Sequence, residues 1–150
     1  MIQARYLEPR FTGDPAWRAA GSGDWNGDGN EDLLFQHADG TVAVWLMKGI
    51  TLQASTLLSP GHPGDARWRV VGSGDFNGDG QPDLLFEHAD GSLAAWLMKG
   101  TQLQEARFLE PASPGHAARK AVAVGDINSD GHDDVLFQHR DGTLGVWLLD

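Results

Sequence analysis

The chain has 150 residues, of which 41% are hydrophobic, 20 are glycine and none is cysteine. This length suits one packed domain, and the glycine content favours tight turns between strands over long helices. The formal charge of −10, with only 11 Lys and Arg residues, argues against nucleic-acid binding, because that function requires a basic patch. The absence of cysteine excludes disulfides and is compatible with both reducing and oxidising compartments. No apolar run approaches the roughly 18 residues that span a bilayer.

The first segment of the chain, Ala4–Pro9, matches a segment much later in the sequence, Ala106–Pro111. The later segment follows three other predicted strands and reads as a fourth strand, so the first segment reads as a fourth strand without a preceding blade. The start, Met1–Tyr6, lacks the apolar stretch of a secretion signal, although such a signal can have been removed.

An acidic loop follows, and it occurs three times at a spacing of 51 residues, at 24–32, 75–83 and 126–134. Its pattern, D-x-N-x-D-G-x-x-D, places oxygen ligands at alternate positions around a glycine turn, which suits a hard cation such as calcium. The carboxylates at positions one, five and nine would otherwise repel one another. Three divalent ions would bring the formal charge from −10 to −4.

The predicted ligands are the side-chain oxygens at positions one, three, five and nine and the backbone carbonyl at position seven, where the residue type varies. They are Asp24, Asn26, Asp28, Asn30 and Asp32 in the first loop, Asp75, Asn77, Asp79, Gln81 and Asp83 in the second, and Asp126, Asn128, Asp130, His132 and Asp134 in the third. We expect up to three calcium ions per chain, with a weaker third site because Ser129 replaces a glycine and Ile127 an aromatic residue. Asx turns that cap a strand junction without metal are the alternative. Magnesium is less suited to a flexible cage made only of protein oxygens.

The second repeat shows the order of the predicted strands. One strand, residues 68–74, enters the acidic loop, and a second, residues 83–88, leaves it. Asp90-Gly91 predicts a type I′ hairpin turn into a third strand, residues 92–98. Lys99-Gly100 then turns the chain into a fourth strand, residues 101–109, which Pro111 closes. Four antiparallel strands in about 50 residues are typical of one propeller blade.

An EF-hand has a similar loop between two helices, but it requires a bidentate glutamate at position 12. That position holds Phe35, Phe86 and Phe137, inside short apolar runs. The sequence therefore argues against the helical alternative, and the aspartate at position nine must close the metal site.

The two longest shared motifs carry a family resemblance. G-D-[FW]-N-G-D-G-x-x-D-L-L-F, followed by D-G-x-x-x-x-W-L-M-K-G, resembles the FG-GAP or VCBS-type repeat of integrin-like, calcium-binding β-propellers, and the likeness covers essentially the whole chain. The resemblance implies calcium in the loop that joins strands one and two of each blade. It also implies a relation to extracellular adhesion proteins and lectin-like propellers.

We therefore predict an all-β fold, a single β-propeller domain of three four-stranded blades. The approximate blades are residues 10–59, 60–110 and 111–150, the last completed by a strand equivalent to residues 2–9 from another chain. Three blades make a tighter ring than the usual four to eight, so we expect a homodimer with six blades. A homotrimer with nine blades is less favoured, and a piece of a longer repeat array would explain the ends equally well.

The face opposite the acidic loops is expected to gather aromatic and imidazole side chains. Rings beside polar groups in a shallow cleft suit a sugar or a peptide side chain. The candidate ligand-binding residues are Trp17, His37, His62, Trp68, His88, His116 and His139. The competing interpretation is that the histidines bond the hairpin backbone and the tryptophans lie between blades.

The repeated tryptophans in the third strands, Trp45, Trp96 and Trp147, are expected to pack in the core, because blades cover both faces there. We predict no catalytic residue, since no nucleophile, base and orienting group form a recognisable set. The acidic pairs in the loops are better explained as metal ligands than as a glycosidase pair.

These observations favour a non-enzymatic, calcium-binding recognition module for glycans or a protein partner. A purely structural propeller stabilised by calcium is the alternative, and a hydrolase or lyase on a propeller scaffold is a minor one. No nucleic-acid partner and no membrane insertion are expected. Calcium sites of modest affinity favour an extracellular or cell-surface location.

Overall fold

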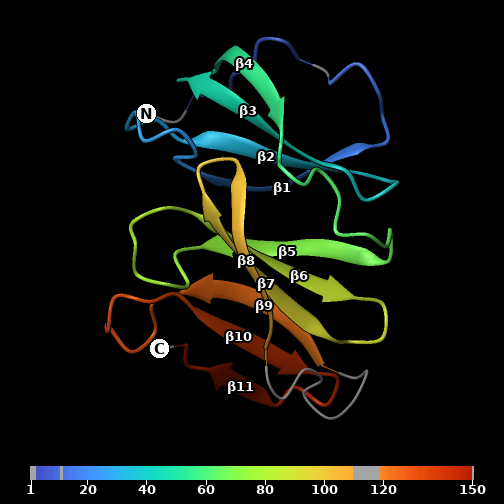
Figure 1. The fold of residues 1–150 in the computed structure, drawn as a ribbon, viewed down its shortest axis with the longest axis vertical. Helices are drawn as coiled ribbons and strands as arrows, with labels where there is room; N and C mark the ends of the chain where they lie inside the picture. The colour runs from blue at the N-terminus through green and yellow to red at the C-terminus, as the bar shows by residue number, and fades with distance from the viewer. Residues whose placement is uncertain (1–2, 11, 110–118, 150) are drawn as a thin grey trace.

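The computed structural model describes residues 3–10, 12–109 and 119–149, which form eleven β-strands and no helix. These residues accordingly contain no helix that is long and apolar enough to cross a membrane. The all-β prediction is confirmed, and the strands fall into three separate antiparallel sheets (Figure 1).

Each sheet follows the order of its strands in the chain, as expected for propeller blades. The first contains β1 (Trp17–Gly23), β2 (Asp32–His37), β3 (Val42–Lys48) and β4 (Thr51–Leu57). The second contains β5 (Trp68–Gly74), β6 (Asp83–His88), β7 (Leu93–Lys99) and β8 (Gln102–Phe108). The third contains β9 (Arg119–Gly125), β10 (Asp134–His139) and β11 (Leu144–Trp147), with β11 at its edge.

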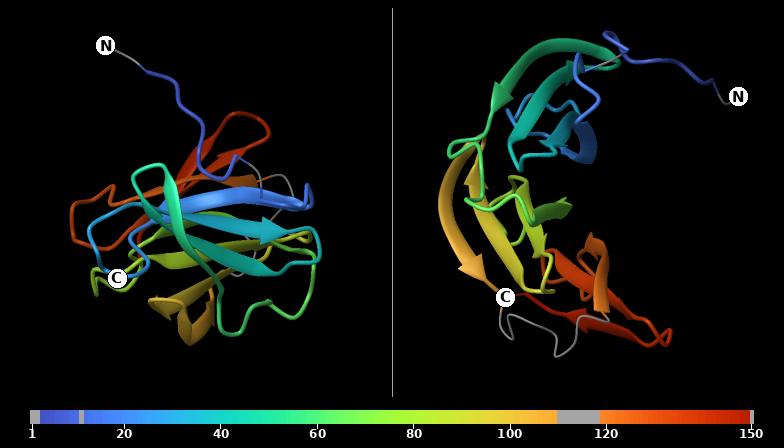
Figure 2. Two further views of the ribbon diagram at one scale, coloured as in Figure 1. Left: turned by 90° about the horizontal axis from the view of Figure 1, so that it is seen from above. Right: turned by 90° about the vertical axis from the view of Figure 1, so that its right-hand side faces the viewer.

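The three blades stack face to face along an open arc (Figure 2). The first strand of each blade lies on the concave inner side, where β1 contacts β5 and β5 contacts β9. The fourth strands, β4 and β8, lie on the convex outer side. The arrangement is that of consecutive blades in a propeller, with the arc left open in a single chain.

The hydrophobic core lies between the blades. Alternate residues of each central strand point to opposite neighbours, so Leu84 and Phe86 of β6 pack toward the first blade while Leu85 packs toward the third. Both groups are almost fully buried. Because each central strand is apolar on both faces, its sequence is a continuous hydrophobic run rather than an alternating one.

Glycines on the inner strands allow neighbouring blades to come close together. A Cβ atom added at Gly21 would lie 2.8 Å from Oγ of Ser73, and one added at Gly72 would lie 2.6 Å from Cγ2 of Val124. The Ser73 hydroxyl also donates a hydrogen bond of 2.9 Å to the carbonyl of Ser22. Blades therefore approach one another most closely near the concave side.

The predicted type I′ turn between the second and third strands is wrong. In the first blade, the N–H of Gly40 bonds the carbonyl of His37 at 2.9 Å, and only Gly40 has a positive φ, of 98°. This is a type I turn followed by a left-handed glycine, which closes a three-residue hairpin loop. The Asp39 side chain favours it by accepting a hydrogen bond of 2.8 Å from the N–H of Thr41. Gly91 and Gly142 repeat the same bond in the other blades.

The N-terminal segment separates into two parts. The backbone of Glu8 bridges to Thr51, through bonds of 2.9 Å from its N–H to Ile50 and 2.8 Å from Leu52 to its carbonyl. Ser59 docks on the second blade in the same way. Residues 3–7 form no strand within the described chain and extend away from the arc (Figure 2).

Gln36 joins the first two blades through a buried pair of hydrogen bonds. Its amide Nε2 donates to the carbonyl of Trp68 at 2.9 Å, and its Oε1 accepts from the N–H of Val70 at 3.0 Å. The side chain is 2% exposed, and Arg18 also donates to its oxygen. Gln36 thus supplies hydrogen-bond partners for the free edge of β5 and closes the interface between the first two blades.

We predict that Gln36→Ala lowers the free energy of unfolding by about 2–4 kcal/mol, since it leaves two buried backbone groups without a partner. Urea unfolding followed by tryptophan fluorescence measures this change. The matched control is Gln104→Ala on the outer strand β8, where the side chain is exposed and faces no neighbouring blade, and it should change stability by less than about 0.5 kcal/mol. Equal losses in the two variants would contradict the role of Gln36.

Candidate metal loops and the opposite face

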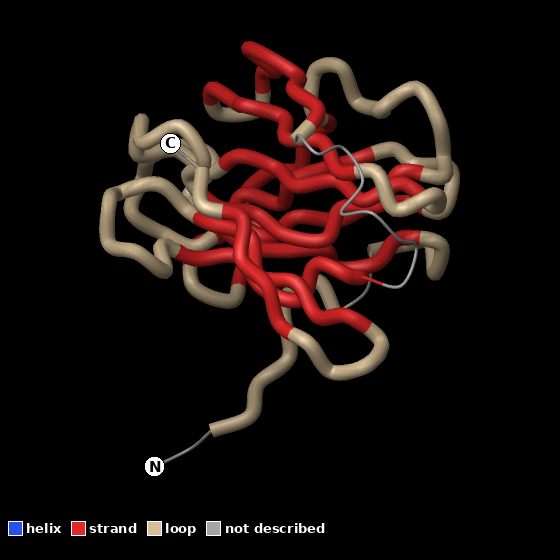
Figure 3. The backbone as a smooth tube through the Cα atoms, turned by 90° about the horizontal axis from the view of Figure 1, so that it is seen from below, coloured by secondary structure: helices blue, strands red, loops and turns tan. Residues whose placement is uncertain are grey.

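The three acidic loops join the first and second strands of their blades, at one end of the strands. The hairpins between the second and third strands lie at the other end, so the molecule has loops on two opposite faces (Figure 3). The loops place all fifteen predicted ligand residues on the same face. We call this the acidic-loop face, and the other the hairpin face.

The side chains at positions one, three and five of each loop fold inward onto the backbone of the same loop. In the first loop, Asp24 accepts hydrogen bonds from the N–H groups of Gly27 at 2.8 Å and Gly29 at 2.7 Å. Asn26 accepts from Asp28 at 2.9 Å, and the carboxylate of Asp28 accepts from Asn30 at 2.8 Å. The second and third loops repeat the bonds between positions one, three, five and seven. These are Asx turns, and they gather the oxygens in each loop.

The aspartate at position nine has a structural role in addition to the ligand role that the sequence predicts. Asp83 is fully buried, and its two oxygens accept hydrogen bonds from the N–H of Phe76 at 3.1 Å and of Met98 at 2.7 Å. Asp32 and Asp134 make the same pair of bonds in their blades. The residue therefore ties the loop to the end of the third strand.

Burial has an electrostatic cost at this position. It raises the pKa of Asp83 to about 6, because desolvation disfavours the carboxylate and the nearby Asp79 and Asp75 repel it. Burial also raises the pKa of Asp32, with smaller contributions from Asp28 and Asp24. In each of these two loops, three carboxylates are thus close enough to act on one another, although the two N–H groups oppose the shift.

The donor set fits a hard cation in its chemistry. Positions one, three, five and nine supply only carboxylate and amide oxygens, the ligands that calcium prefers. In the part of the chain that the structure describes, no three His, Asp or Glu side chains lie where they could together hold a metal ion. The oxygens point instead to backbone N–H groups of the same loop, so an ion would have to exchange with some of these bonds.

The third loop differs from the other two at its glycine position. Ser129 has a φ of 61°, the left-handed region that Gly27 and Gly78 adopt at the equivalent positions. A side chain in this region costs about 1–2 kcal/mol. The third loop keeps its hydrogen bonds despite this cost. Because its folded conformation is less favourable than that of the other loops, we expect the third metal site to be weaker.

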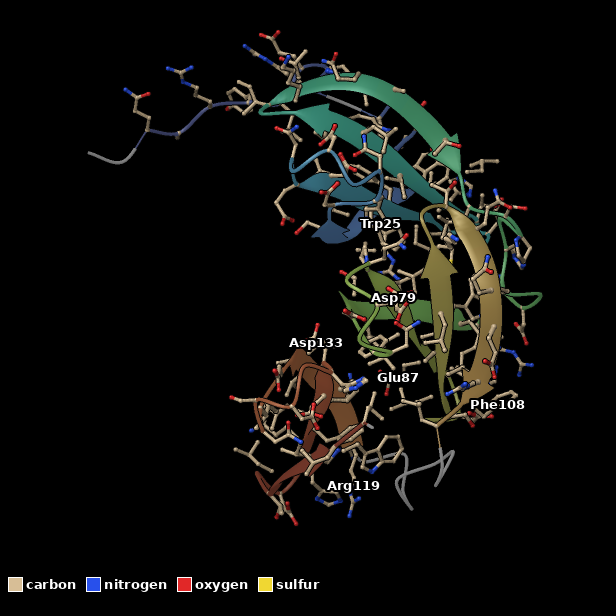
Figure 4. All side chains as sticks on the ribbon, turned by 60° about the vertical axis from the view of Figure 1, so that its left-hand side comes forward. Trp25, Asp79, Glu87, Phe108, Arg119 and Asp133 are labelled. Carbon is tan, nitrogen blue, oxygen red and sulfur yellow. The ribbon has the colours of Figure 1, made fainter. Side chains whose placement is uncertain are left out.

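Position two of the loop is a structural residue that sequence reasoning missed. Trp25 and Phe76 are 2% and 6% exposed and belong to the two core clusters between blades, whereas Ile127 is 51% exposed (Trp25 is labelled in Figure 4). The aromatic ring anchors each of the first two loops against the following blade. An aromatic residue between an aspartate and an asparagine, both predicted ligands, was the available signal.

The second and third loops are also bonded to each other. The carboxylate of Asp133, at position eight, accepts a hydrogen bond of 2.8 Å from the N–H of Asp75. The N–H of Asp133 donates to the carbonyl of Asp75 at 2.7 Å. The His132 ring packs against Gly78, where a Cβ atom would lie 2.9 Å from its Cε1. A change in one loop therefore reaches its neighbour through direct contacts.

The hairpin face gathers the predicted aromatic and imidazole residues as expected. Trp17 pairs with His37 across β1 and β2, and their rings are 5.1 Å apart. Trp68 and His88 repeat the pair at 4.8 Å, and Arg119 stands opposite His139 in the third blade. His116 lies outside the described residues.

The histidines in this group bond the hairpins. Nδ1 of His37 lies 2.9 Å from the carboxylate of Asp39, and Nε2 lies 3.3 Å from Asp14, so these two acids raise the pKa of His37. His88 and His139 contact Asp90 and Asp141 in the same way. Nε2 of His62 donates to the carbonyl of Asp39 at 2.6 Å, and its Nδ1 accepts from Gly64. These contacts support the structural interpretation of the histidines.

Aromatic hollows recur at equivalent positions near the hairpin face. The hollow of the second blade has a volume of about 220 Å³ and contains Trp68, Trp96 and Phe108. The first blade has a hollow of about 210 Å³ beside Trp17 and Trp45, and the third one of about 110 Å³ beside Trp147. The expectation of core packing is confirmed for Trp96, which is 7% exposed, and Trp147 is half-buried but packs against the second core cluster. Trp45 is half-buried and belongs to neither cluster.

A family model described as an FG-GAP-like repeat matches residues 24–86 and 75–137. The two matches together cover more than half of the chain. The chain belongs to the FG-GAP-like repeat family. A search of curated proteins gave no significant match.

The extent of the FG-GAP-like matches agrees with the blade structure. Each match starts at position one of an acidic loop, crosses a blade boundary and ends at Phe86 or Phe137, in the second strand of the next blade. All three loops of this FG-GAP-like chain therefore lie inside the matched region. The segments between the loops contribute residues to the hollows, and both matches also include such a segment.

Proposed function

We propose that this FG-GAP-like chain is a non-enzymatic recognition module that binds calcium in its acidic loops and glycans in its aromatic hollows. The observation that carries the ligand-binding part is the recurrence of the hollows in all three blades. In each, a phenylalanine of the second strand and a tryptophan of the third have ring centroids 4.6–4.8 Å apart. Repetition suits several weak equivalent binding sites, whose affinities combine by multivalency, better than it suits a single reaction centre.

The second hollow has the composition of a sugar-binding site. Trp68 and Phe108 lie with their rings 5.9 Å apart, and Phe108 is 64% exposed. Such an exposed ring offers a flat apolar surface for the C–H face of a sugar. Arg107 lines the same hollow and offers hydrogen-bond donors for hydroxyl groups. A peptide side chain or a purely structural role are the competing possibilities.

We predict that Phe108→Ala removes glycan binding in the second hollow while leaving the fold intact, because the ring is mostly exposed. A glycan array followed by NMR titration with each sugar that binds measures the loss. Ile50→Ala is the matched control, since Ile50 is an exposed apolar residue at a turn on the acidic-loop face. No binding to a broad array by the wild-type chain would favour the structural alternative.

Two features of the loops support the proposal of calcium binding: their oxygen donors and the mutual repulsion of their carboxylates. Positions one, three, five and nine, with the carbonyl of position seven, would hold up to three ions per chain, and the ions would neutralise that repulsion. Their contribution is stability of the folded blades, since an ion that binds only the folded state shifts unfolding by mass action. Extracellular calcium at millimolar concentration would fill sites of modest affinity, so we propose an extracellular location.

We predict that calcium raises the melting temperature more than magnesium does, and that a chelator reverses the rise. Each site should add about 2.7 kcal/mol when calcium is at about 100 times its dissociation constant. Asp28→Asn should reduce the calcium-dependent rise, because it weakens one site while keeping the hydrogen-bond acceptor. Glu31→Gln, at the exposed position eight of the same loop, should not. Identical melting with calcium and with chelator would contradict the proposal.

We also propose that two copies of the chain pair into a six-bladed ring, with a three-copy ring less favoured. The edge of β11 is open in the described structure, and Leu144 and Val146 on that strand are 60% and 39% exposed. Unpaired apolar edges of this kind are prone to pair with a further strand. The equivalent edges pair Ala94 with Phe108 and Ala95 with Arg107. By this register, residue 145 of one copy would face Tyr6 of the other.

We predict that prolines in the N-terminal segment, introduced as Arg5→Pro with Tyr6→Pro, convert the assembly into monomers, because proline removes the N–H groups that strand pairing needs. Light scattering coupled to size-exclusion chromatography measures the mass. The control, Arg5→Ala with Tyr6→Phe, keeps the backbone donors and should keep the assembly. A wild-type chain that remains monomeric at high concentration would contradict the ring.

A further inference from the structure

A cavity of about 260 Å³ lies between the second and third blades, at the hairpin face. The starts of β5 and β9 and the hairpin between β6 and β7 surround it. Its charged lining consists of Arg67, Arg69, Glu87, Arg119 and Lys120 (Glu87 and Arg119 are labelled in Figure 4). It is separate from the acidic loops, which lie at the other end of the same strands.

The cavity lies where the residue that closes the first blade interface is replaced at the second. At the first interface, Gln36 closes the gap by donating to one backbone group of β5 and accepting from another. The equivalent residue at the second interface is Glu87. A carboxylate accepts hydrogen bonds but cannot donate one, so it cannot reproduce the bond to the carbonyl of the following blade. Glu87 remains partly exposed and makes no hydrogen bond with β9.

The lining is basic, which is unusual in a chain with a formal charge of −10. Arg67 is committed to Asp65, with 2.6 Å between Nη2 and Oδ2. Arg69, Arg119 and Lys120 form no ion pair with any acidic side chain of the described residues. Burial raises the pKa of Glu87, and Lys120 acts against that rise. Three cationic groups therefore share the cavity with one carboxyl group.

Part of this basic character is specific to the second interface. At the first interface, Arg18 and Arg69 occupy the positions of Arg69 and Lys120, whereas Ala16 and Trp68 occupy those of Arg67 and Arg119. Two substitutions to arginine and one to glutamate thus distinguish the second interface from the first. The repeat pattern does not explain these three residues, and none of them packs in either core cluster.

We propose that this cavity binds a small hydroxylated carboxylate, such as a sugar acid, with one site per chain. The guanidinium groups of Arg69 and Arg119 can receive a carboxylate through paired N–H donors, and Lys120 adds a point charge. Glu87 accepts hydrogen bonds from the hydroxyl groups. A doubly charged inorganic anion is disfavoured because it would face the Glu87 carboxyl group without offering it a donor. The site goes beyond the proposed function, which uses the hollows and the loops.

Titration of the wild-type chain with sodium glucuronate at low ionic strength, followed by ¹H–¹⁵N NMR, tests this proposal. We expect saturable shifts at residues of β5, β9 and the β6–β7 hairpin. Glucose, which lacks the carboxylate, should cause no shifts there, and neither should acetate or sulfate at equal concentration and ionic strength. Sulfate that binds as tightly as glucuronate would overturn the assignment to a hydroxylated carboxylate.

Two variants locate the site. Lys120→Ala should weaken glucuronate binding about tenfold, a loss typical of one removed charge-assisted contact. Glu87→Gln should close the cavity and abolish binding, because the introduced amide can bond β9 as Gln36 bonds β5. Lys99→Ala is the charge-matched control, since Lys99 ends β7 at the acidic-loop face, and it should leave binding unchanged.

Unchanged binding in both Lys120→Ala and Glu87→Gln would overturn the proposal, as would the absence of glucuronate binding to the wild type. Thermal melting of each variant confirms that it is folded. Phe108→Ala should retain glucuronate binding, so a failure of the hollows as glycan sites and a failure of this cavity are distinguishable.

Discussion

The buried aspartate at the end of each acidic loop is the contact on which the blade structure depends. Asp32, Asp83 and Asp134 are fully buried, and each bonds the second residue of its own loop and a residue at the end of the third strand. One carboxylate thereby fixes three segments that are not adjacent in the sequence. In the first two loops this second residue is Trp25 or Phe76, whose ring packs against the next blade, so the same contact also sets how successive blades meet.

This contact connects the stability of the fold with the electrostatics of the loops. A buried carboxylate is costly unless its oxygens are bonded, and two N–H groups meet that requirement for Asp83. Its neighbours Asp75 and Asp79 add repulsion that these bonds do not remove. A cation near the loop would act on that remaining repulsion. The fold and the proposed metal site therefore use the same aspartate for different purposes.

The sequence predicted the strands well because their signals are local and occur three times. The bounds of β5 and β6 agree with the prediction, since a glycine-rich loop separates two short apolar runs. The hairpin turn was predicted wrongly because Asp-Gly is compatible with two turn types, and the choice depends on the bond from Thr41 to Asp39. The position-nine aspartate was assigned only to metal, because its partner on the third strand lies 15 residues away.

The differences between equivalent positions were harder to interpret from sequence than the repeats themselves. Gln36, Glu87 and Gln138 look interchangeable in a polar position of the second strand, yet the first is buried between blades and the last is exposed. Only the placement of the following blade shows that one residue closes an interface and another leaves a cavity. Likewise, Trp45, Trp96 and Trp147 look equivalent in the sequence, yet Trp96 is buried in the core while Trp45 lies outside both core clusters.

The inner glycines have a consequence for the geometry of any complete ring. Gly21 and Gly72 let neighbouring first strands approach more closely than the outer strands do, so each pair of blades forms a wedge that is narrow at the centre. The angle of this wedge determines how many blades fit into a full circle. A side chain at either position would widen the narrow end and flatten the curvature. The absence of two side chains on the inner wall is thus part of what sets the curvature of the arc.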